Sequence, residues 1–251
     1  MTALRLPKKI NNFLDKLIAN SNKRVSLREV ASFGISGMKV AFDYDEDNFY
    51  IDILESYAND LDEADKEDFY RSVFHEAMHG WLLLVEGFYM LESKEKFHLS
   101  DEEMKIKSIL FSMISDIAVN FRIRKEGFSP FPSSYPSVVK NETEAFRVKK
   151  DYYSSLRELG DFFCSKFKIN RYISAWSFVR YFDLDENAKS ILSNFFSSFK
   201  EGLPSEYEEC ERIIDLIEQN NLFSSEGQKV VMAKISEMWG LAGKTNLIQL
   251  K

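Results

Sequence analysis

Two of the three histidines in the chain, His75 and His79, lie four residues apart inside an apolar segment that runs from Val73 to Leu82. A helix turns once every 3.6 residues, so it would place both imidazoles on one face, about 40° apart around its axis. In apolar surroundings the two rings would be partly buried and would need polar partners. The segment is therefore predicted to be a buried helix that presents two histidines to one common partner.

The helical pattern around this segment extends from about Asp62 to Glu92, with several acidic residues near its start. Acidic side chains stabilise a helix N-terminus because they interact favourably with the partial positive charge there. Gly87 weakens the pattern, since glycine costs about 1 kcal/mol relative to alanine inside a helix. We therefore expect one helix that breaks or bends by Gly87.

The residues before this helix predict a small sheet. Met38 to Tyr44 and Phe49 to Leu54 are rich in β-branched and aromatic residues, and they flank the turn formers Asp45 to Asn48. Two such runs joined by a short polar turn are typical of a β-hairpin. Because side chains alternate along a strand, Phe49, Ile51 and Ile53 should form the drier face of the second arm.

Two shorter helices are expected nearer the N-terminus. Apolar residues recur at helical spacing from Ile10 to Ile18. Ser26 to Glu29 has the form of a capping box, with Ser followed three residues later by Glu. This second signal predicts a short helix that begins there and ends near Gly34.

A second long helix is predicted over Met104 to Lys125, where apolar residues form one broad stripe. Ser100 to Glu103 forms another capping box directly before it. Gly127 should close the helix, and Phe128 to Pro136, with three prolines, should be a loop.

The chain after this loop is expected to be wholly helical. The fold class is therefore α+β and mainly helical, with a small hairpin or sheet and one site-bearing helix. We expect a core over residues 1–127 and a helical subdomain over 128–251 that packs on it. The predicted C-terminal helices are Glu144–Lys168, Arg171–Phe182, Asn187–Lys200, Ser205–Gln219 and Ser225–Leu241.

Composition and charge exclude several kinds of partner. A net charge of -7 over 251 residues gives no basic field to attract nucleic acid or an anionic membrane. The apolar run Trp81 to Val85 is far shorter than the roughly 20 residues that cross a bilayer. Met1 to Lys23 lacks the apolar segment of a signal peptide. Cys164 and Cys210, far apart, give no disulfide framework, so a cytoplasmic protein is expected.

The run His75 to His79 has the spacing His-Glu-x-x-His, with Glu76 beside the first histidine. Two imidazoles on one helix face can bind a single zinc ion, and the adjacent carboxylate can move a proton during hydrolysis. A zinc ion would also satisfy polar groups that the apolar helix would otherwise bury at a cost. The sequence therefore predicts a zinc site with Glu76 as the catalytic carboxylate.

A catalytic zinc site takes three protein ligands, so a third must come from elsewhere. His98 lies in a polar connector and is expected to be an exposed surface residue. Asp116 interrupts an apolar helix, where a lone carboxylate would be costly without a cation. Asn120, one turn later on the same face, could accept the outer N–H of a ligating imidazole.

Three glutamates remain open as alternatives to Asp116 for the third ligand. Glu86 continues the histidine stripe, but it lies seven residues, or roughly 10 Å, beyond His79 along an unbroken helix. It would therefore need a broken helix to reach the ion. Glu102 and Glu103 are the other two.

At these residues the chain resembles the zincin metallopeptidases, and within them the gluzincins and aspzincins, in which a carboxylate from a downstream helix completes the site. The gluzincin helix carries Glu-x-x-x-Asp, and the run from Asp116 to Asn120 is similar to a shorter counterpart that ends in an amide. It is also similar to the Asp-x-x-Val-Asn segment of bacterial and archaeal metallopeptidase-like proteins. The resemblance covers roughly Met38 to Lys125. It implies a zincin sheet that includes the hairpin, a bound Zn²⁺ and a peptide or protein substrate held by strand pairing.

Two functions follow as hypotheses. The first is peptide hydrolysis with His75, His79 and Asp116 as zinc ligands and Glu76 as general base and then acid. The second is a catalytically inactive, zincin-like interaction protein that binds partners through the aromatic residues of its C-terminal half, although their helical spacing favours an ordinary core. Residues considered for the oxyanion partner are Tyr135, Tyr152 and Tyr153.

Overall fold

The computed structural model describes residues 6–33, 39–55, 63–129, 135–147 and 153–250. Over these ranges the chain is α+β and mainly helical, with one three-stranded mixed sheet and one two-stranded sheet, as the sequence predicts. It forms two compact units. The first comprises Met1–Phe88, Arg122–Pro132 and Gln249–Lys251, and the second comprises Tyr89–Phe121 and Ser133–Ile248.

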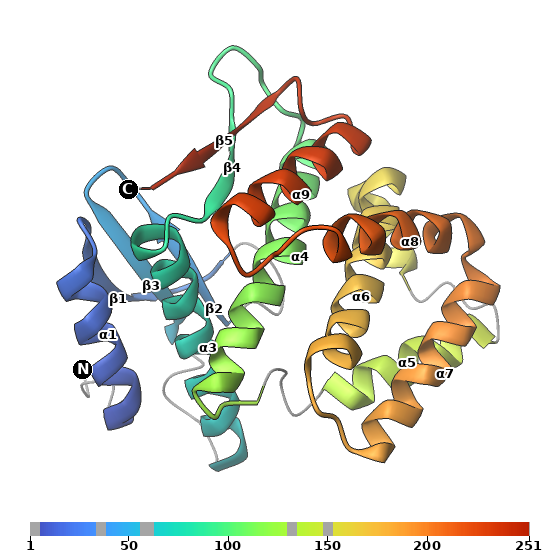
Figure 1. Ribbon diagram of the computed structural model, residues 1–251, viewed down its shortest axis with the longest axis horizontal. Coiled ribbons are helices and arrows are strands. Elements are labelled where there is room, and N and C mark those ends of the chain that lie inside the picture. The colour runs from blue at the N-terminus through green and yellow to red at the C-terminus, as the bar shows by residue number, and fades with distance from the viewer. Residues whose placement is uncertain (1–5, 34–38, 56–62, 130–134, 148–152, 251) are drawn as a thin grey trace. The chain divides into compact units, whose positions relative to one another are not determined.

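The first unit is built on strands β1 (Arg24–Val30), β2 (Val40–Tyr44) and β3 (Asn48–Leu54). Strand β3 lies in the middle, parallel to β1 and antiparallel to β2 (Figure 1). The predicted hairpin is thus confirmed over the described residues, and Met38 lies outside them. The side chains of Phe49, Ile51 and Ile53 are fully buried, which confirms the drier face of the second arm.

Strand β1 occupies the segment for which a short helix was predicted from Ser26 to Glu29, and that prediction is wrong. Arg28 lies directly opposite Asp52 on β3, and its Nε donates a 2.7 Å hydrogen bond to that carboxylate. The guanidinium also stacks 4.1 Å above the ring of Tyr50. These contacts, together with the ladder to β3, outweigh a local capping pattern. The expected end near Gly34 lies outside the described residues.

Helix α1 (Lys8–Asn20) confirms the predicted N-terminal helix and buries Ile10, Leu14 and Leu17. It packs beside helix α3 (Glu63–Gly80), which carries both histidines. Gly80 lets α3 approach the sheet closely, because a Cβ at this position would lie only 2.8 Å from the ring of Phe49.

After Gly80 the helix widens into a π-helical turn, η1 (Trp81–Val85), in which the N–H of Glu86 donates to the carbonyl of Trp81. Gly87 then adopts a φ of 70°, so the predicted break by Gly87 is confirmed. The chain does not return to a helix as far as Glu92. It continues as strand β4 (Tyr89–Ser93), because a positive φ at Gly87 ends helical geometry.

Helix α4 (Asp101–Lys125) begins at the predicted capping box. The N–H of Glu103 donates to Ser100 Oγ at 3.2 Å, and the N–H of Ser100 donates to the Glu103 carboxylate at 2.9 Å. Gly127, with a φ of 80°, closes the helix as expected. The predicted loop from Phe128 is shorter than expected at its far end, because helix α5 (Tyr135–Arg147) already includes Pro136 near its start.

The prediction of one helix over Glu144–Lys168 is wrong, because parts of three elements lie in that segment. Helix α5 ends at Arg147, a 3₁₀ turn, η2, covers Ser154–Leu159, and helix α6 runs over Asp161–Tyr181. Gly160 separates the last two with a φ of 116°. A Cβ at this position would overlap the carboxylate of Glu102, which instead accepts a 3.0 Å hydrogen bond from the N–H of Phe163. Helix α6 also continues without a break across the gap expected before Arg171.

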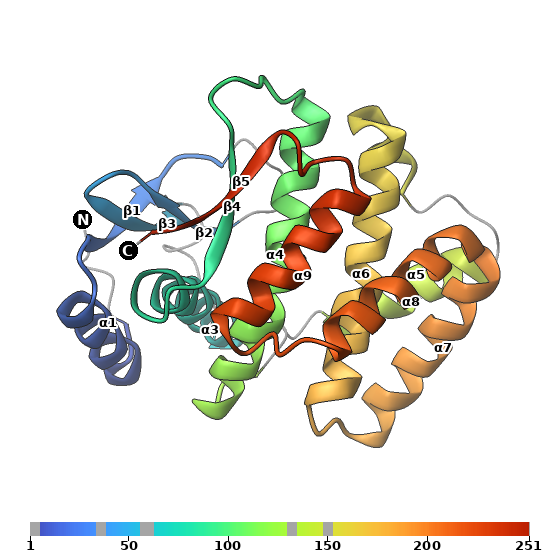
Figure 2. The ribbon, with the colours of Figure 1, turned by 45° about the horizontal axis from the view of Figure 1, so that its top comes forward.

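Helices α7 (Glu186–Gly202), α8 (Pro204–Glu218) and α9 (Ser225–Met238) confirm the other three predicted C-terminal helices. The expectation of a wholly helical C-terminal half is wrong, because strand β5 (Thr245–Gln249) follows and pairs with β4 (Figure 2). Gln228 on α9 bonds both the N–H and the carbonyl of Tyr89, which anchors β4 at its start. Such pairing across about 150 residues leaves no local signal in the sequence.

Aromatic residues form much of the core of the second unit, as their helical spacing predicts. Phe195 and Phe199 are fully buried, and the ring of Tyr172 lies 4.8 Å from that of Phe199. Cys164 and Cys210 are both buried. Among the helices of the described ranges, none has the length and apolar character needed to cross a membrane.

Candidate metal centre

The two histidines of α3 meet at their outer nitrogens. His79 is buried and His75 is half-buried, and their Nε2 atoms lie 3.2 Å apart. The two rings are 4.9 Å apart with an angle of 70° between their planes. On the sheet side, the ring of Phe42 from β2 lies 5.2 Å from that of His79. The sequence prediction that α3 presents both imidazoles on one face is therefore confirmed.

The separation of the two nitrogens fits a shared zinc ion. Zn–N bonds of 2.0–2.1 Å in a tetrahedral site place two ligating nitrogens about 3.3–3.4 Å apart. The observed 3.2 Å between His75 Nε2 and His79 Nε2 is close to this value. Without an ion, the same pair can share one proton as an N–H···N hydrogen bond, which also needs one neutral ring. In the first case both rings offer an electron pair to the ion, and in the second case one ring donates its N–H to the other.

Asp116 joins the histidines in the one group of potential metal ligands found among the described residues. His75, His79 and Asp116 each offer one ligand atom, and these atoms all lie within 4.8 Å of one another. Asp116 is half-buried on α4, between the buried residues Ile114 and Ile117. Two imidazoles and one carboxylate form a donor set used by catalytic zinc sites, which leave a fourth position open.

Glu76 is half-buried and follows His75 on α3. At 100° per residue, its side chain leaves the helix about 60° from the direction of His79. The carboxylate therefore flanks the histidine face and does not project from the opposite side of the helix. This placement suits a group that acts beside an ion and does not ligate it.

The three alternative third ligands are engaged elsewhere. Glu86 accepts hydrogen bonds from Trp81 Nε1 at 2.9 Å and from Arg122 Nη2 at 2.7 Å. Glu102 accepts the N–H of Phe163, at the start of α6. Glu103 completes the capping box and also pairs with Lys244, whose hydrogen bond is the main cause that lowers the pKa of this carboxyl. His98 is exposed, as expected.

The proposed supporting residues have mixed outcomes. Asn120 is buried on α4, and its Oδ1 has no hydrogen-bond partner among the described residues. Its predicted bond to an imidazole therefore stays a prediction. Tyr135 and Tyr153 are buried in the second unit, in ring contact with Phe178 and Phe167 respectively, which fits core packing. Tyr152 lies outside the described residues.

Sequence reasoning missed the π-helical turn that follows the histidines. Residues 81–85 are all apolar or aromatic, so their pattern does not distinguish a π-helix from an α-helix. The signal that could have found it is Glu86, a carboxylate placed where it can reach back to the indole of Trp81. π-Helical turns of this kind occur often at functional sites.

Comparisons of the chain with protein-family models, with curated proteins and with solved structures found no match. The chemistry of the site is therefore inferred from the side chains that form it. Those side chains are two closely spaced imidazole nitrogens, a nearby carboxylate on α4 and a second carboxylate on the flank of α3.

Proposed function

We propose that the protein is a zinc-dependent metallohydrolase that cleaves peptide bonds, with His75, His79 and Asp116 as the metal ligands. The observation that carries the proposal is the 3.2 Å separation of His75 Nε2 and His79 Nε2 on one face of α3. Asp116, within 4.8 Å of both in the ligand group, supplies the carboxylate of the set. The set leaves one position of a tetrahedral ion for water or substrate.

When bound, zinc supplies Lewis acidity, which lowers the pKa of water and polarises a substrate carbonyl. Glu76 acts as the general base and then as the general acid. Its carboxylate takes a proton from the attacking water and delivers it to the leaving amine nitrogen. Its half-buried position on the flank of the histidine face supports this role, because partial exclusion of water strengthens proton transfer within the site.

Strand β2 is the best candidate to hold an extended peptide substrate. Among the described residues β2 pairs on one side only, with β3. Phe42 of β2 brings its ring to within 5.2 Å of the ring of His79. An extended peptide can bind beside the outer strand of a sheet, where the side chains near that strand set the specificity.

The alternative of an inactive interaction protein draws little support from the aromatic residues of the C-terminal half. An aromatic docking surface would need several exposed rings. Of the eight phenylalanines considered for it, Phe162 alone is exposed, at 44%. The buried or half-buried members are Phe163, Phe167, Phe178, Phe182, Phe195, Phe196 and Phe199.

Zinc content and hydrolysis, measured on the same preparations, test the proposed function. The wild-type protein should hold one zinc ion per chain by elemental analysis, and His75→Ala should lose it. Glu76→Gln should keep the zinc ion and lose peptide hydrolysis. The matched control is His98→Ala, because His98 is exposed and outside the ligand group. A wild-type protein that neither contains nor takes up zinc would refute the proposal.

The variant Asp116→Ala tests whether Asp116 is the third zinc ligand, independently of the two histidines. If Asp116 is the third ligand, this variant should bind zinc at least about 10- to 100-fold more weakly than the wild type, because loss of a residue that only supports a ligand already costs that much. Unchanged zinc affinity in Asp116→Ala would leave the two histidines as ligands and assign the third position to another group.

We also propose that the protein acts in the cytoplasm, where thiols stay reduced. Support for this location comes from the small number of cysteines, because Cys164 and Cys210 are far apart in the sequence and both are buried. Cell fractionation with an antibody to the native protein tests it, and recovery from an extracytoplasmic fraction would contradict it.

A further inference from the structure

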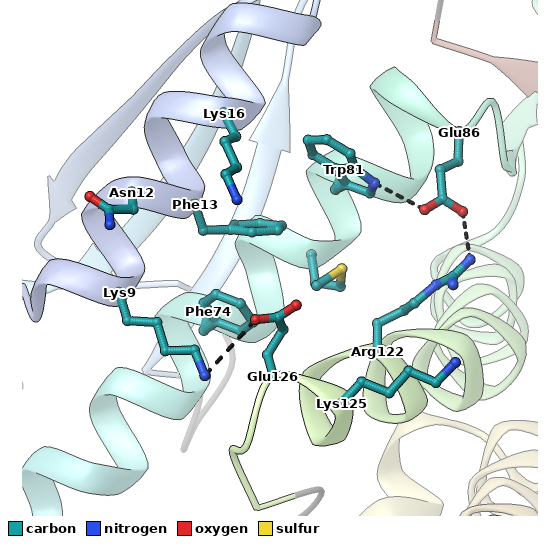
Figure 3. Close-up of a pocket in the computed structure, with 11 residues that line it drawn as sticks. Lys9, Asn12, Phe13, Lys16, Phe74, Trp81, Glu86, Arg122, Lys125 and Glu126 are labelled. Carbon is teal, nitrogen blue, oxygen red and sulfur yellow. Dashed lines mark hydrogen bonds and ion pairs between the residues drawn. The ribbon is translucent and has the colours of Figure 1, made fainter.

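The first unit contains a cavity of about 430 Å³ that is separate from the histidine face. It is bordered by α1, by α3 with its π-helical turn, and by the end of α4 (Figure 3). Phe74 and Met78 line it, and each precedes one of the two histidines by a single residue. One residue is a rotation of 100° around a helix, so the cavity and the histidines use different faces of α3.

One side of the cavity is an aromatic surface. The ring of Phe13 lies 4.7 Å from that of Phe74 and 5.6 Å from that of Trp81. Phe128 continues the row, because its ring stacks on Phe74 at 4.6 Å with an angle of 26°. Phe74 is fully buried, so the half-buried rings of Phe13 and Trp81 form the apolar face against which a flat aromatic group can pack in offset or edge-on geometry.

The remaining lining is positively charged, although the whole chain carries a net charge of -7. Four of the lining residues are cationic and two are acidic. Both acidic residues already have cationic partners. Glu86 Oε2 accepts a 2.7 Å hydrogen bond from Arg122 Nη2, and Glu126 Oε2 lies 3.9 Å from Lys9 Nζ. The lining therefore keeps an excess of positive charge, which favours an anionic ligand.

Two of the cations are placed to meet that anion. The Arg122 side chain lines the cavity and is 29% exposed, and its Nη2 binds Glu86. A guanidinium has five N–H donors, so the bond to Glu86 leaves others that can bind a carboxylate. Lys16 extends from α1 toward Phe13 and Trp81, as Figure 3 shows. Positively charged and aromatic side chains thus line the same cavity.

We propose that this cavity binds a small aromatic carboxylate. Its ring packs on Phe13 and Trp81, and its carboxylate binds Arg122 and Lys16. The volume of about 430 Å³ lies within the range of roughly 300–1,000 Å³ that small-molecule sites show. The inference does not depend on zinc binding or on hydrolysis.

Calorimetric titration of the full chain with 2-naphthoate tests the proposal. One molecule should bind per chain, and the uncharged isostere 2-naphthamide should bind about tenfold more weakly, because it lacks the charge that the two cations recognise. Octanoate, an aliphatic carboxylate, should also bind more weakly because it cannot stack on the rings. No binding of 2-naphthoate at about 1 mM, or equal affinity for either comparison ligand, would overturn the proposal.

Variants on α1 then place the ligand in this cavity. Lys16→Met should weaken 2-naphthoate binding about 2- to 5-fold, the loss expected when one exposed charge contact is removed. Lys8→Met is the matched control, because Lys8 is exposed on the same helix and does not line the cavity. Circular dichroism checks that both variants are folded. Equal affinity in the two variants would show that the carboxylate is not held at Lys16 and would overturn the assigned site.

Discussion

Arg122, in the last turn of α4, donates a 2.7 Å hydrogen bond to Glu86, the residue at which the π-helical turn η1 ends. The other oxygen of Glu86 accepts a 2.9 Å bond from the indole N–H of Trp81, the first residue of the same turn. Glu86 therefore ties the two ends of η1 together and joins them to α4. Because η1 continues directly from the helix that carries His75 and His79, this carboxylate holds the end of the proposed metal-binding helix.

Glu86→Ala should therefore destabilise the protein. The side chain is 29% exposed and makes one charged and one neutral hydrogen bond, so we expect a loss of about 1–3 kcal/mol in the free energy of unfolding. Urea denaturation measures it. Glu92→Ala, at an exposed position on β4, is the control and should change stability by less than about 0.5 kcal/mol. A loss no larger than that of the control would mean that Glu86 does not hold the turn.

Gly80→Ala tests how closely α3 must approach the sheet. The added Cβ would lie 2.8 Å from Phe49 Cε1 and 3.1 Å from Leu17 Cδ2, and both side chains are fully buried. Overpacking of this kind costs about 1–3 kcal/mol, which outweighs the better helix propensity of alanine. Denaturant unfolding should show this loss.

Gly202→Ala is the matched control for that substitution. Gly202 ends helix α7, and a Cβ there would lie at an ordinary contact distance of 3.6 Å from Phe146 Cβ. The control should therefore be neutral or slightly stabilising. If Gly80→Ala behaved in the same way, the close packing of α3 on Phe49 would not be a constraint.

One sequence pattern occurs twice in the chain with opposite outcomes, and the reason is physical. At Ser100 to Glu103 the capping box forms both reciprocal bonds and begins α4. At Ser26 to Glu29 the same pattern lies in strand β1, because Arg28 finds its partners at Asp52 and Asp43, far along the chain. A pattern within four residues reports local bonds, and it cannot report partners that the fold brings from elsewhere.

The capping box of α4 gives a prediction for acid stability. The hydrogen bond from Lys244, followed by that from the N–H of Ser100, holds the pKa of Glu103 below its ordinary value of 4.5. A carboxyl with a lowered pKa in the folded state stabilises the fold above its unfolded pKa, and this contribution is lost as the pH falls through the folded value. Glu103→Gln should thus be less stable than the wild type at pH 7, by at most about 1 kcal/mol at this partly exposed position.

Unfolding curves between pH 7 and acid conditions check the sign of that effect. The difference between wild type and Glu103→Gln should shrink below about pH 4.5, where the carboxyl of the unfolded wild type is protonated. Glu95→Gln, at an exposed turn residue, is the control and should show a small difference at every pH. A Glu103→Gln difference that stayed constant into acid would contradict the charge-based role.

The candidate site was predictable to the extent that its determinants are local. His75, Glu76 and His79 lie within five residues on one helix, so helical geometry alone places them together. The choice between Asp116 and Glu86 depends on what each carboxylate meets in three dimensions. Glu86 is held by Trp81 and Arg122, and that arrangement follows from a π-helical turn which the apolar sequence does not reveal.

Zinc removal should lower the thermal stability of the protein if the proposed centre is correct. A ligand that binds only the folded state stabilises it by about 2.7 kcal/mol when its free concentration is 100 times its Kd. Chelation of the ion should therefore lower Tm, and added zinc should restore it. If no ion binds, the Nε2 atoms of His75 and His79, which lie 3.2 Å apart, form an N–H···N hydrogen bond instead. His75→Ala should abolish the response of Tm to zinc, whereas His98→Ala, at an exposed position, should keep it. Calorimetry in chelator and in excess zinc distinguishes these outcomes, and a Tm that does not respond to zinc in the wild type would show that the histidine pair is a hydrogen-bonded pair and not a metal centre.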